Sequence, residues 1–237
     1  MGALQVGRRA MVVCAALIVR PDSDVYTPQE LAHKSVAIDH GNGTAYAALQ
    51  MLEGAMPRSA VTTVAAMTSP AERFAGLMRG DFEATVVQEP YITVAEKAGC
   101  RIIATTFFHG TWVATADVTA ETYAAFLRAI TRAVGRINAD KRRYVSYFIR
   151  DFPGIPEVEV LTPEDFNLDR IRLKPPSPIP EDEARFVWEW MVGWGVLHGE
   201  FDVTTQINRT VQRQAHELAA TTLAARGAEV FRLAFSV

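Results

Sequence analysis

The fold is decided by the stretch from Ser35 to Thr106, which opens S-V-A-I-D-H-G-N-G-T-A-Y-A-A-L over residues 35–49. This opening is a short apolar run that leads through a glycine-rich turn into an alanine-rich helical run. Short β-branched runs and helical runs keep alternating to residue 106, which predicts a β-α-β-α-β-α-β order. Strands that alternate with helices form a parallel sheet covered on both faces. The stretch therefore predicts a small α/β lobe.

Capping residues predict where two helices of this lobe begin and end. Thr27, Pro28 and Glu30 match the N-cap, the first helical position and the acidic third position of a capping box. Ser69 begins a second capping pattern, and Gly80 is suited to end that helix in a left-handed conformation. Pro90 is predicted at the first position of the helix after the third strand.

Composition and charge indicate which partners and which cysteine chemistry to expect. Of 237 residues, 49% are hydrophobic, and 24 basic and 27 acidic residues leave a net charge of -3. No long block of one sign appears, so neither a nucleic acid nor an anionic membrane surface is expected as a partner. Cys14 and Cys100 lie in apolar runs, and two cysteines cannot form a disulfide framework. We expect both to be buried free thiols.

The segments on either side of the lobe have different patterns. The apolar run Met11 to Val19 follows two arginines and could be read as a signal peptide. It ends at Arg20 without a small-x-small cleavage site, which favours a buried strand. From Thr119 onward the patterns are helical, with a proline-rich linker at residues 173–180 and a tryptophan-containing helix after it.

The order of motifs resembles the solute-binding proteins of ABC importers, in the branch that binds sulfonates, taurine, nitrate and thiamine-pyrimidine precursors. The residues that carry the resemblance form an N-terminal and a later group. The first group is Ile18-Val19-Arg20-Pro21-Asp22-Ser23, Thr27, Glu30-Leu31, Lys34, Val36-Ala37 and Gly41. The second is Arg73 to Ala84, Glu89-Pro90-Tyr91, Ala95 and Gly99. Each motif alone is weak, whereas their common order and spacing are specific.

The resemblance implies a type-II periplasmic-binding-protein-like α/β fold whose two lobes close on a small-molecule ligand. Residues 27–108 would form one complete parallel-sheet lobe. Residues 1–26 would be a hinge strand with a remnant of the other lobe, and residues 109–237 a return hinge with that lobe's C-terminal part. The second lobe would thus be partial and mostly helical. The resemblance also implies an ABC permease as the partner and the periplasm or cell envelope as the location. The cytoplasm is the alternative location, because no clear signal peptide is present.

The sequence departs from the family at its beginning. Chains of the family start with a signal peptide and a β-α-β-α-β unit, neither of which is recognisable here. The helices of the second lobe would then expose apolar faces such as Phe126, Ile130 and Val134, which need a cover. Three explanations stay open: a start codon assigned too late, a fragment, or a dimer or second chain that supplies the missing sheet.

Three groups of residues are candidates for ligand binding. Turns at the carboxyl ends of parallel strands bind ligands, and helix N-termini favour anions. The first group is His40, Gly41, Asn42, Gly43 and Thr44, the second is Gln88 and Glu89, and the third is His109 and Trp112. Each group also has a purely structural alternative. It is an ordinary βα turn for the first group, a turn at the start of a helix for the second, and a packed hinge with a hydrogen-bonded histidine for the third.

An enzyme on the same fold is the alternative function. The resemblance extends to cytoplasmic lyases, decarboxylases and a desulfinase, and His40, Glu89 and His109 could act as acids or bases if they share a cleft. No metal-binding or nucleophile motif has the required spacing. We therefore expect neither a metal nor a cofactor, and the solute-binding function is favoured.

Overall fold

The computed structural model describes residues 2–39, 43–65 and 69–234, which form two compact units. The α/β unit consists of Val12–Phe108 and Asp140–Arg172. The helical unit consists of Met1–Met11, His109–Ala139 and Leu173–Val237. Each unit is thus built from segments that are distant in the sequence.

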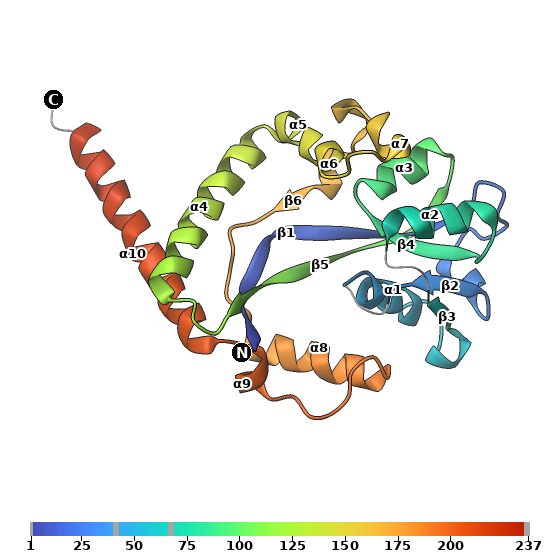
Figure 1. Ribbon diagram of the computed structural model, residues 1–237, viewed down its shortest axis with the longest axis horizontal. Helices are drawn as coiled ribbons and strands as arrows, with labels where there is room; N and C mark the ends of the chain where they lie inside the picture. Colours follow the sequence, from blue (N-terminus) through green and yellow to red (C-terminus); the bar gives the residue numbers. More distant parts are fainter. Residues whose placement is uncertain (1, 40–42, 66–68, 235–237) are drawn as a thin grey trace. The chain divides into compact units, whose positions relative to one another are not determined.

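The elements follow one another as Figure 1 labels them. The strands are β1 (Ala3–Val19), β2 (Ser35–Ile38), β3 (Thr62–Ala65), β4 (Ala84–Gln88), β5 (Arg101–Thr115) and β6 (Arg172–Leu173). The longer helices are α1 (Gly43–Glu53), α2 (Pro70–Arg79), α3 (Tyr91–Lys97), α4 (Ala120–Ala139), α8 (Glu181–Gly193) and α10 (Arg209–Ala234). The short helices are α5 (Lys141–Tyr144), α6 (Ser146–Arg150), α7 (Pro156–Glu159) and α9 (Val203–Gln206).

The described strands form one sheet in the order β3-β2-β4-β1-β5, and β6 pairs with β1. Strand β2 is parallel to β3, with Ile38 opposite Ala65, and parallel to β4, with Ala37 opposite Thr85. This confirms a parallel core. The expected uninterrupted run of parallel strands is wrong at one place, because β1 lies between β4 and β5 and is antiparallel to β4, with Ala15 opposite Gln88.

Both faces of the sheet are covered at its centre. Residues 14–19 of β1 are all buried, and so are residues 84–87 of β4. Successive side chains of a strand point to opposite faces, so a continuous buried run requires packing on both sides. Helices α1, α2 and α3 all pack against β4. The run Met11 to Val19 is therefore a buried strand, as the sequence predicts.

Local signals placed several boundaries correctly. The Ser69 hydroxyl accepts a hydrogen bond from the Glu72 N–H, and α2 ends at Gly80 with φ 82°. The Glu30 carboxylate closes the predicted capping box at Thr27, although the turn it caps is a 3-10 helix. The boundary at Pro90 differs by one position, because Pro90 is the N-cap of α3 and not its first residue.

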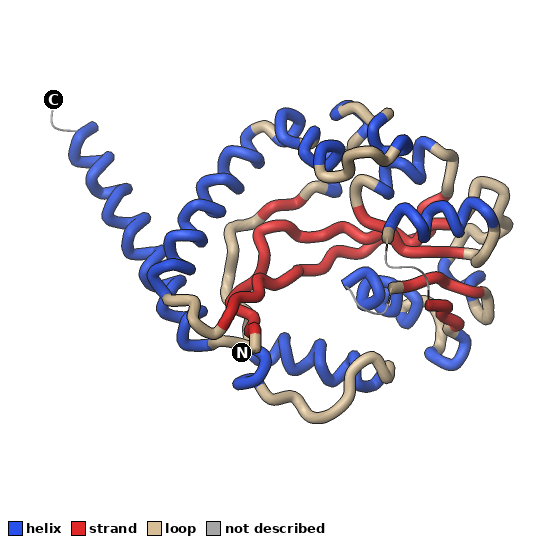
Figure 2. Tube along the Cα trace, in the orientation of Figure 1, coloured by secondary structure: helices blue, strands red, loops and turns tan. Residues whose placement is uncertain are grey.

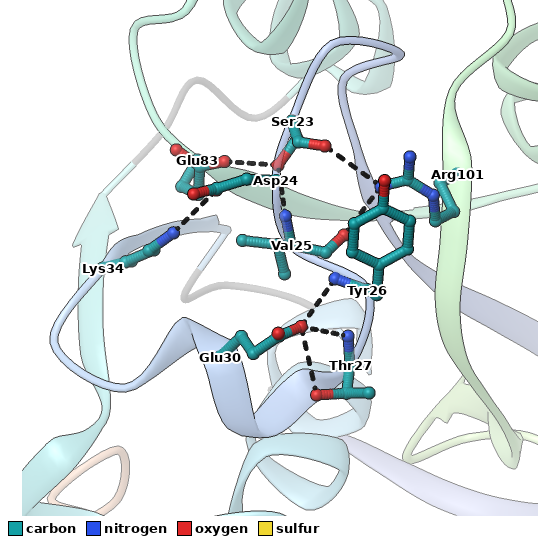
Figure 3. A network of polar contacts seen from close by, with 9 residues as sticks. All are labelled: Ser23, Asp24, Val25, Tyr26, Thr27, Glu30, Lys34, Glu83 and Arg101. Atoms are coloured by element: carbon teal, nitrogen blue, oxygen red, sulfur yellow. Dashed lines mark hydrogen bonds and ion pairs between the residues drawn. The ribbon is translucent and has the colours of Figure 1, made fainter.

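The loop after β1 is fastened to the start of β5 by Arg101 (Figure 3). The Arg101 guanidinium donates hydrogen bonds to the carbonyl oxygens of Ser23 (3.2 Å) and Val25 (2.8 Å) and lies over the ring of Tyr26, 3.9 Å from its centre. The hydroxyl of Ser23 in turn donates to Glu83 at 2.7 Å. These contacts hold the loop from residue 20 to 27 against the α/β unit.

The helical unit has its own apolar core between α4 and α10, which lie side by side in Figure 2. The core is formed by residues from β1, α4 and α10: Val6, Ala120, Tyr123, Ala124, Leu127, Ala215 and Ala219. Of the residues expected on an exposed face of α4, Phe126 is 37% exposed, whereas Val134 is 3% exposed and packs inside. Among the described helices none combines the length and apolar character needed to cross a membrane.

Two further differences from the sequence prediction concern element lengths. Strand β5 continues to Thr115, beyond residue 106 where the predicted alternation of strands and helices ends. The helical pattern near the C-terminal end is divided into the short α9 and the longer α10, because Asn208 caps the start of α10. Cys14 and Cys100 are both free and buried, as expected.

Candidate functional site

The parallel strands of the α/β unit end at one edge of the sheet. Because β2 is parallel to β3 and to β4, their carboxyl ends face the same way. Each strand is followed by a helix: α1 after β2, α2 after β3 and α3 after β4. Open α/β sheets bind ligands outside such an edge. This edge is therefore the candidate site.

The turn after β2 provides the first group of candidates. His40, Gly41 and Asn42 lie outside the described residues. Gly43 begins α1, and Thr44 is 4% exposed and follows it on the first turn of that helix. That this turn lies next to the end of β4 stays a prediction.

Gly43 lies against an aromatic ring from β5. A β-carbon at Gly43 would be 2.5 Å from Cε2 of Phe108, which is closer than any side chain allows. Phe108 directly precedes His109, the first residue of the third group of candidates. Within the α/β unit, the ring of Phe108 therefore forms a wall beside the first residue of α1.

Arg73 brings a buried positive charge to the same edge. Its side chain is 1% exposed, and Nη1 lies 4.0 Å from Oδ2 of Asp39, the residue that follows β2. Burial lowers the pKa of the Arg73 guanidinium, and the nearby Asp39 carboxylate opposes that shift. Sequence reasoning missed this residue, because an arginine in the first turns of an amphipathic helix normally faces solvent.

Gln88, the second group's first candidate, ends β4. It is half-buried and stands opposite Ala15 in the antiparallel pair with β1. Its side-chain amide has no hydrogen-bond partner within the described residues. An amide carries two donors and an acceptor, so Gln88 can bind either a carboxylate-like or an amino group.

Glu89 is engaged in a buried ion pair. Its side chain is 4% exposed, and Oε1 lies 3.2 Å from Nε of Arg170, whose Nη2 also contacts Glu96 at 2.6 Å. Oε2 of Glu89 accepts hydrogen bonds from the N–H and the hydroxyl of Thr93 at 3.2 and 2.8 Å. Burial raises the pKa of Glu89, and Arg170 and Thr93 counteract this effect.

This arrangement gives Glu89 a structural task. Arg170 comes from the segment Asp140–Arg172, so the ion pair fastens that segment to the start of α3. The sequence contained no signal for this pairing, because the two residues belong to distant segments. The predicted role of Glu89 in ligand binding or acid–base catalysis stays a prediction.

His109 and Trp112 belong to the helical unit. Partial burial of the His109 imidazole lowers its pKa, and the positive charges of Arg8 and Lys174 lower it further. The ring of Trp112 packs edge-on against Phe126 at 5.0 Å, and Arg9 lies over it at 5.1 Å from the ring centre. Trp112 thus contributes to the packing of that unit.

The candidate residues are divided between the two units. The α/β unit contains Gly43, Thr44, Gln88 and Glu89, together with Arg73, whereas His109 and Trp112 lie in the other unit. Within the described ranges, no group of three or more histidine, cysteine, aspartate or glutamate side chains is placed to hold a metal ion.

Comparison with known sequences gave no match. No protein-family model matches the chain, and no curated protein matches it.

Solved structures are similar over most of the chain. The periplasmic aliphatic sulphonate binding protein SsuA from Escherichia coli has a TM-score of 0.63 and 16% identity, over 86% of this chain and 68% of its own. The alkanesulfonate-binding protein SsuA from Xanthomonas axonopodis pv. citri, bound to MOPS, has a TM-score of 0.65 and 16% identity, over 85% and 72%.

An enzyme shares the architecture. A mutant of DSZB in complex with biphenyl-2-sulfinic acid has a TM-score of 0.58 and 13% identity, over 91% of this chain and 79% of its own; a further structure describes DSZB as a desulfurization enzyme. The fold is thus compatible with binding and with catalysis. The chain has the α/β fold of SsuA-type periplasmic binding proteins, as the sequence predicts.

Proposed function

We propose that the protein binds a small organic anion, with sulfonates as the first class to test, at the carboxyl edge of strands β2, β3 and β4. The observation that carries the proposal is the parallel pairing of β2 with β4. That pairing puts the start of α1 and the end of β4 at the same sheet edge.

The charges near this edge suit an anion. Helix α1 begins directly after the turn, and the N–H groups at a helix N-terminus favour negative charge. Asp39 by itself would repel an anion. Nη1 of Arg73 lies 4.0 Å from Oδ2 of Asp39 and offsets that negative charge. The N-terminus of α1 then remains to attract a bound anion.

Gln88 and Phe108 supply the remaining features of a small-molecule site. Such sites combine apolar walls with a few polar groups that fix orientation. The Gln88 amide offers donors to sulfonate or carboxylate oxygens, and the Phe108 ring beside Gly43 offers an apolar surface. Sulfonate, nitrate, taurine and pyrimidine-precursor ligands all present a polar group that a donor amide can bind.

The proposal extends to partner and place. The similar binding proteins are described as periplasmic or as belonging to ABC-type import. By analogy, this protein would deliver its ligand to an ABC permease from the periplasm or cell envelope. His40, Gly41 and Asn42 would complete the binding turn, and His109 and Trp112 remain proposed contacts.

Thermal unfolding with a ligand panel tests the proposal. We expect an increase in Tm with at least one alkanesulfonate, taurine, nitrate, aromatic acid or pyrimidine, because ligand at 100 times its Kd stabilises by about 2.7 kcal/mol. Calorimetric titration would then measure the Kd. An unchanged Tm across the panel would contradict the proposal.

A substitution locates the binding site. Gln88→Ala should weaken the binding of the active ligand by roughly tenfold, because one hydrogen bond to a charged group contributes about 1.5 kcal/mol. Gln29→Ala is the matched control, since Gln29 is an exposed glutamine of the same unit, away from the edge. Equal affinities for the two variants would place the site elsewhere.

Chemical analysis of the same mixtures separates binding from catalysis. We expect the active ligand to be recovered unchanged after long incubation. If the ligand is converted, and His40→Ala or His109→Ala abolishes that conversion, the enzyme alternative is favoured. That alternative is considered because the fold is similar to that of DSZB.

A further inference from the structure

Helix α10 packs on α4 through small apolar side chains. Ala215 and Ala219 of α10 share one buried core with Ala124 and Leu127 of α4. The two helices lie side by side in Figure 2. Such a core is stabilised by excluding water, so a charge introduced into it weakens it. His216, which follows Ala215 on α10, is half-buried and is the titratable residue closest in sequence to these alanines.

The side chain of His216 brings a polar atom into this core. Its Nε2 atom is buried and has no hydrogen-bond partner among the described residues. The imidazole contacts the phenol ring of Tyr123 in α4, with the ring centres 6.4 Å apart and the ring planes at 83°. Tyr123 is 4% exposed, and its hydroxyl is likewise buried without a hydrogen-bond partner in the described part of the chain.

This environment favours the neutral form of His216. A neutral imidazole has one N–H and one unprotonated nitrogen, whereas an imidazolium has an N–H at both nitrogens. Whichever nitrogen carries the proton of the neutral ring, protonation leaves a charged ring with an N–H at the buried Nε2 position. A charge buried without a partner is unfavourable. In agreement with this, burial lowers the pKa of His216.

The charged groups of the surrounding elements do not compensate this cost. The acidic side chains are Glu121 of α4 and Glu217 of α10, which line one small hollow between the two helices. The groups that carry or can acquire positive charge are Arg8 and Arg9 of β1, His109 of β5 and Arg213 of α10. Burial by itself lowers the pKa of His216, so none of these described groups offsets that shift or adds to it appreciably.

We propose that His216 makes the packing of α10 on α4 sensitive to pH, so that its protonation in mild acid loosens α10 from the core of the helical unit. Separation of the two helices allows water to solvate the imidazolium, which the closed packing prevents. This device lies within the helical unit, and it does not depend on the ligand or on the binding edge proposed for the α/β unit.

The direction of the effect follows from the pKa of the ring in the two states. A solvated imidazole has the ordinary pKa of 6.5, and the pKa of packed His216 is lower. Above pH 6.5 the ring is neutral in both states, and the packing has its full stability. As the pH falls below 6.5, the separated state takes up a proton first, so the packing loses stability until packed His216 is protonated as well.

Hydrogen–deuterium exchange followed by mass spectrometry tests the proposal. Peptides that cover residues 209–221 of α10 and 84–88 of β4 are compared at about pH 7.5 and about pH 5.5, after correction for intrinsic exchange rates. In the wild type, the protection of the α10 peptide should fall at least about threefold at the lower pH, because one titrating group changes the opening constant by at most about tenfold per pH unit. The β4 peptide should keep its protection.

Two substitutions assign the effect to His216. His216→Phe keeps an aromatic ring against Tyr123 without a titrating group, and His216→Gln serves if the phenylalanine variant does not fold. Each variant should abolish the pH dependence of the α10 peptide. His198→Gln is the matched control, because His198 is an exposed histidine of the same unit, and it should keep the wild-type dependence.

Several results would overturn the proposal. One is equal protection of the α10 peptide at both pH values in the wild type, and another is a pH dependence that survives in the His216 variants. A parallel loss of protection in α10 and β4 would show that acid acts on the whole fold. NMR titration of the folded wild type needs no variant: a His216 imidazole that titrates at or above pH 6.5 would also contradict the proposal.

Discussion

At position 43 the structure has no room for a side chain, because the ring of Phe108 occupies the place of a β-carbon. The sequence predicts Gly43 as a candidate ligand contact in the turn after β2. The contact supplies a different reason for it, since it joins the start of α1 to β5 inside the α/β unit. Glycine is therefore required at this position for packing, whether or not the turn also binds a ligand.

Gly43→Ala is therefore expected to destabilise the protein by about 1–3 kcal/mol, through displacement of the Phe108 ring. Denaturant unfolding measures this loss. Gly135→Ala is the control: Gly135 lies inside α4, where a β-carbon would meet no atom within 4 Å. Alanine there should stabilise by about 0.5–1 kcal/mol. A neutral Gly43→Ala would mean that Phe108 moves aside freely.

At the scale of elements, the 3-10 turn at Pro163–Asp165 is attached to α3 by one carboxylate. Asp165 accepts a hydrogen bond from Nζ of Lys97 at 2.8 Å and another from the Thr162 N–H at 2.7 Å. These contacts, with Lys97 the largest, lower the pKa of Asp165 from 3.8 to about 2. The charged carboxylate is therefore favoured more in the folded than in the unfolded state.

The stability contributed by Asp165 is consequently present above pH 3.8 and is lost as the pH falls towards 2. Asp165→Asn should remove this part of the acid sensitivity, so the free energy of unfolding should change less between these pH values than in the wild type. Glu164→Gln, at the exposed neighbouring residue, should keep the wild-type dependence. Parallel pH profiles for all three proteins would contradict the assignment.

At the scale of the whole molecule, the α/β unit is assembled from two distant segments, and Arg170 connects them. Removing its charge would leave Glu89 buried without its partner. Breaking a buried pair in this way costs about 3–5 kcal/mol. We expect that loss for Arg170→Met, measured as the free energy of unfolding in denaturant.

The double variant Arg170→Met/Glu89→Gln should recover part of this loss, because no unpaired charge then remains buried. If the double variant is no more stable than Arg170→Met, the ion pair does not stabilise the association of the two segments. If Arg170→Met loses less than about 1 kcal/mol, the ion pair is screened by solvent.

The sequence by itself determined the α/β class, the Met11 to Val19 part of β1, the caps of α2 and the parallel pairing expected for β2, β3 and β4, whereas the beginning of β1 at Ala3 was not predicted. Hydrophobic periodicity and helix capping depend on neighbours within a few positions, so they can be recognised in a single sequence. For the same reason, the turn after β2 and the end of β4 could be proposed as a candidate site.

Only the tertiary structure decided that β1 lies antiparallel between β4 and β5, that Arg170 pairs with Glu89, and that Arg73 lies buried beside Asp39. Each of these features joins residues far apart in the sequence. Strand order and buried charge pairing are chosen by the packing of the whole unit, where burial cost and Coulomb attraction compete. The result of that competition cannot be predicted from a local sequence pattern.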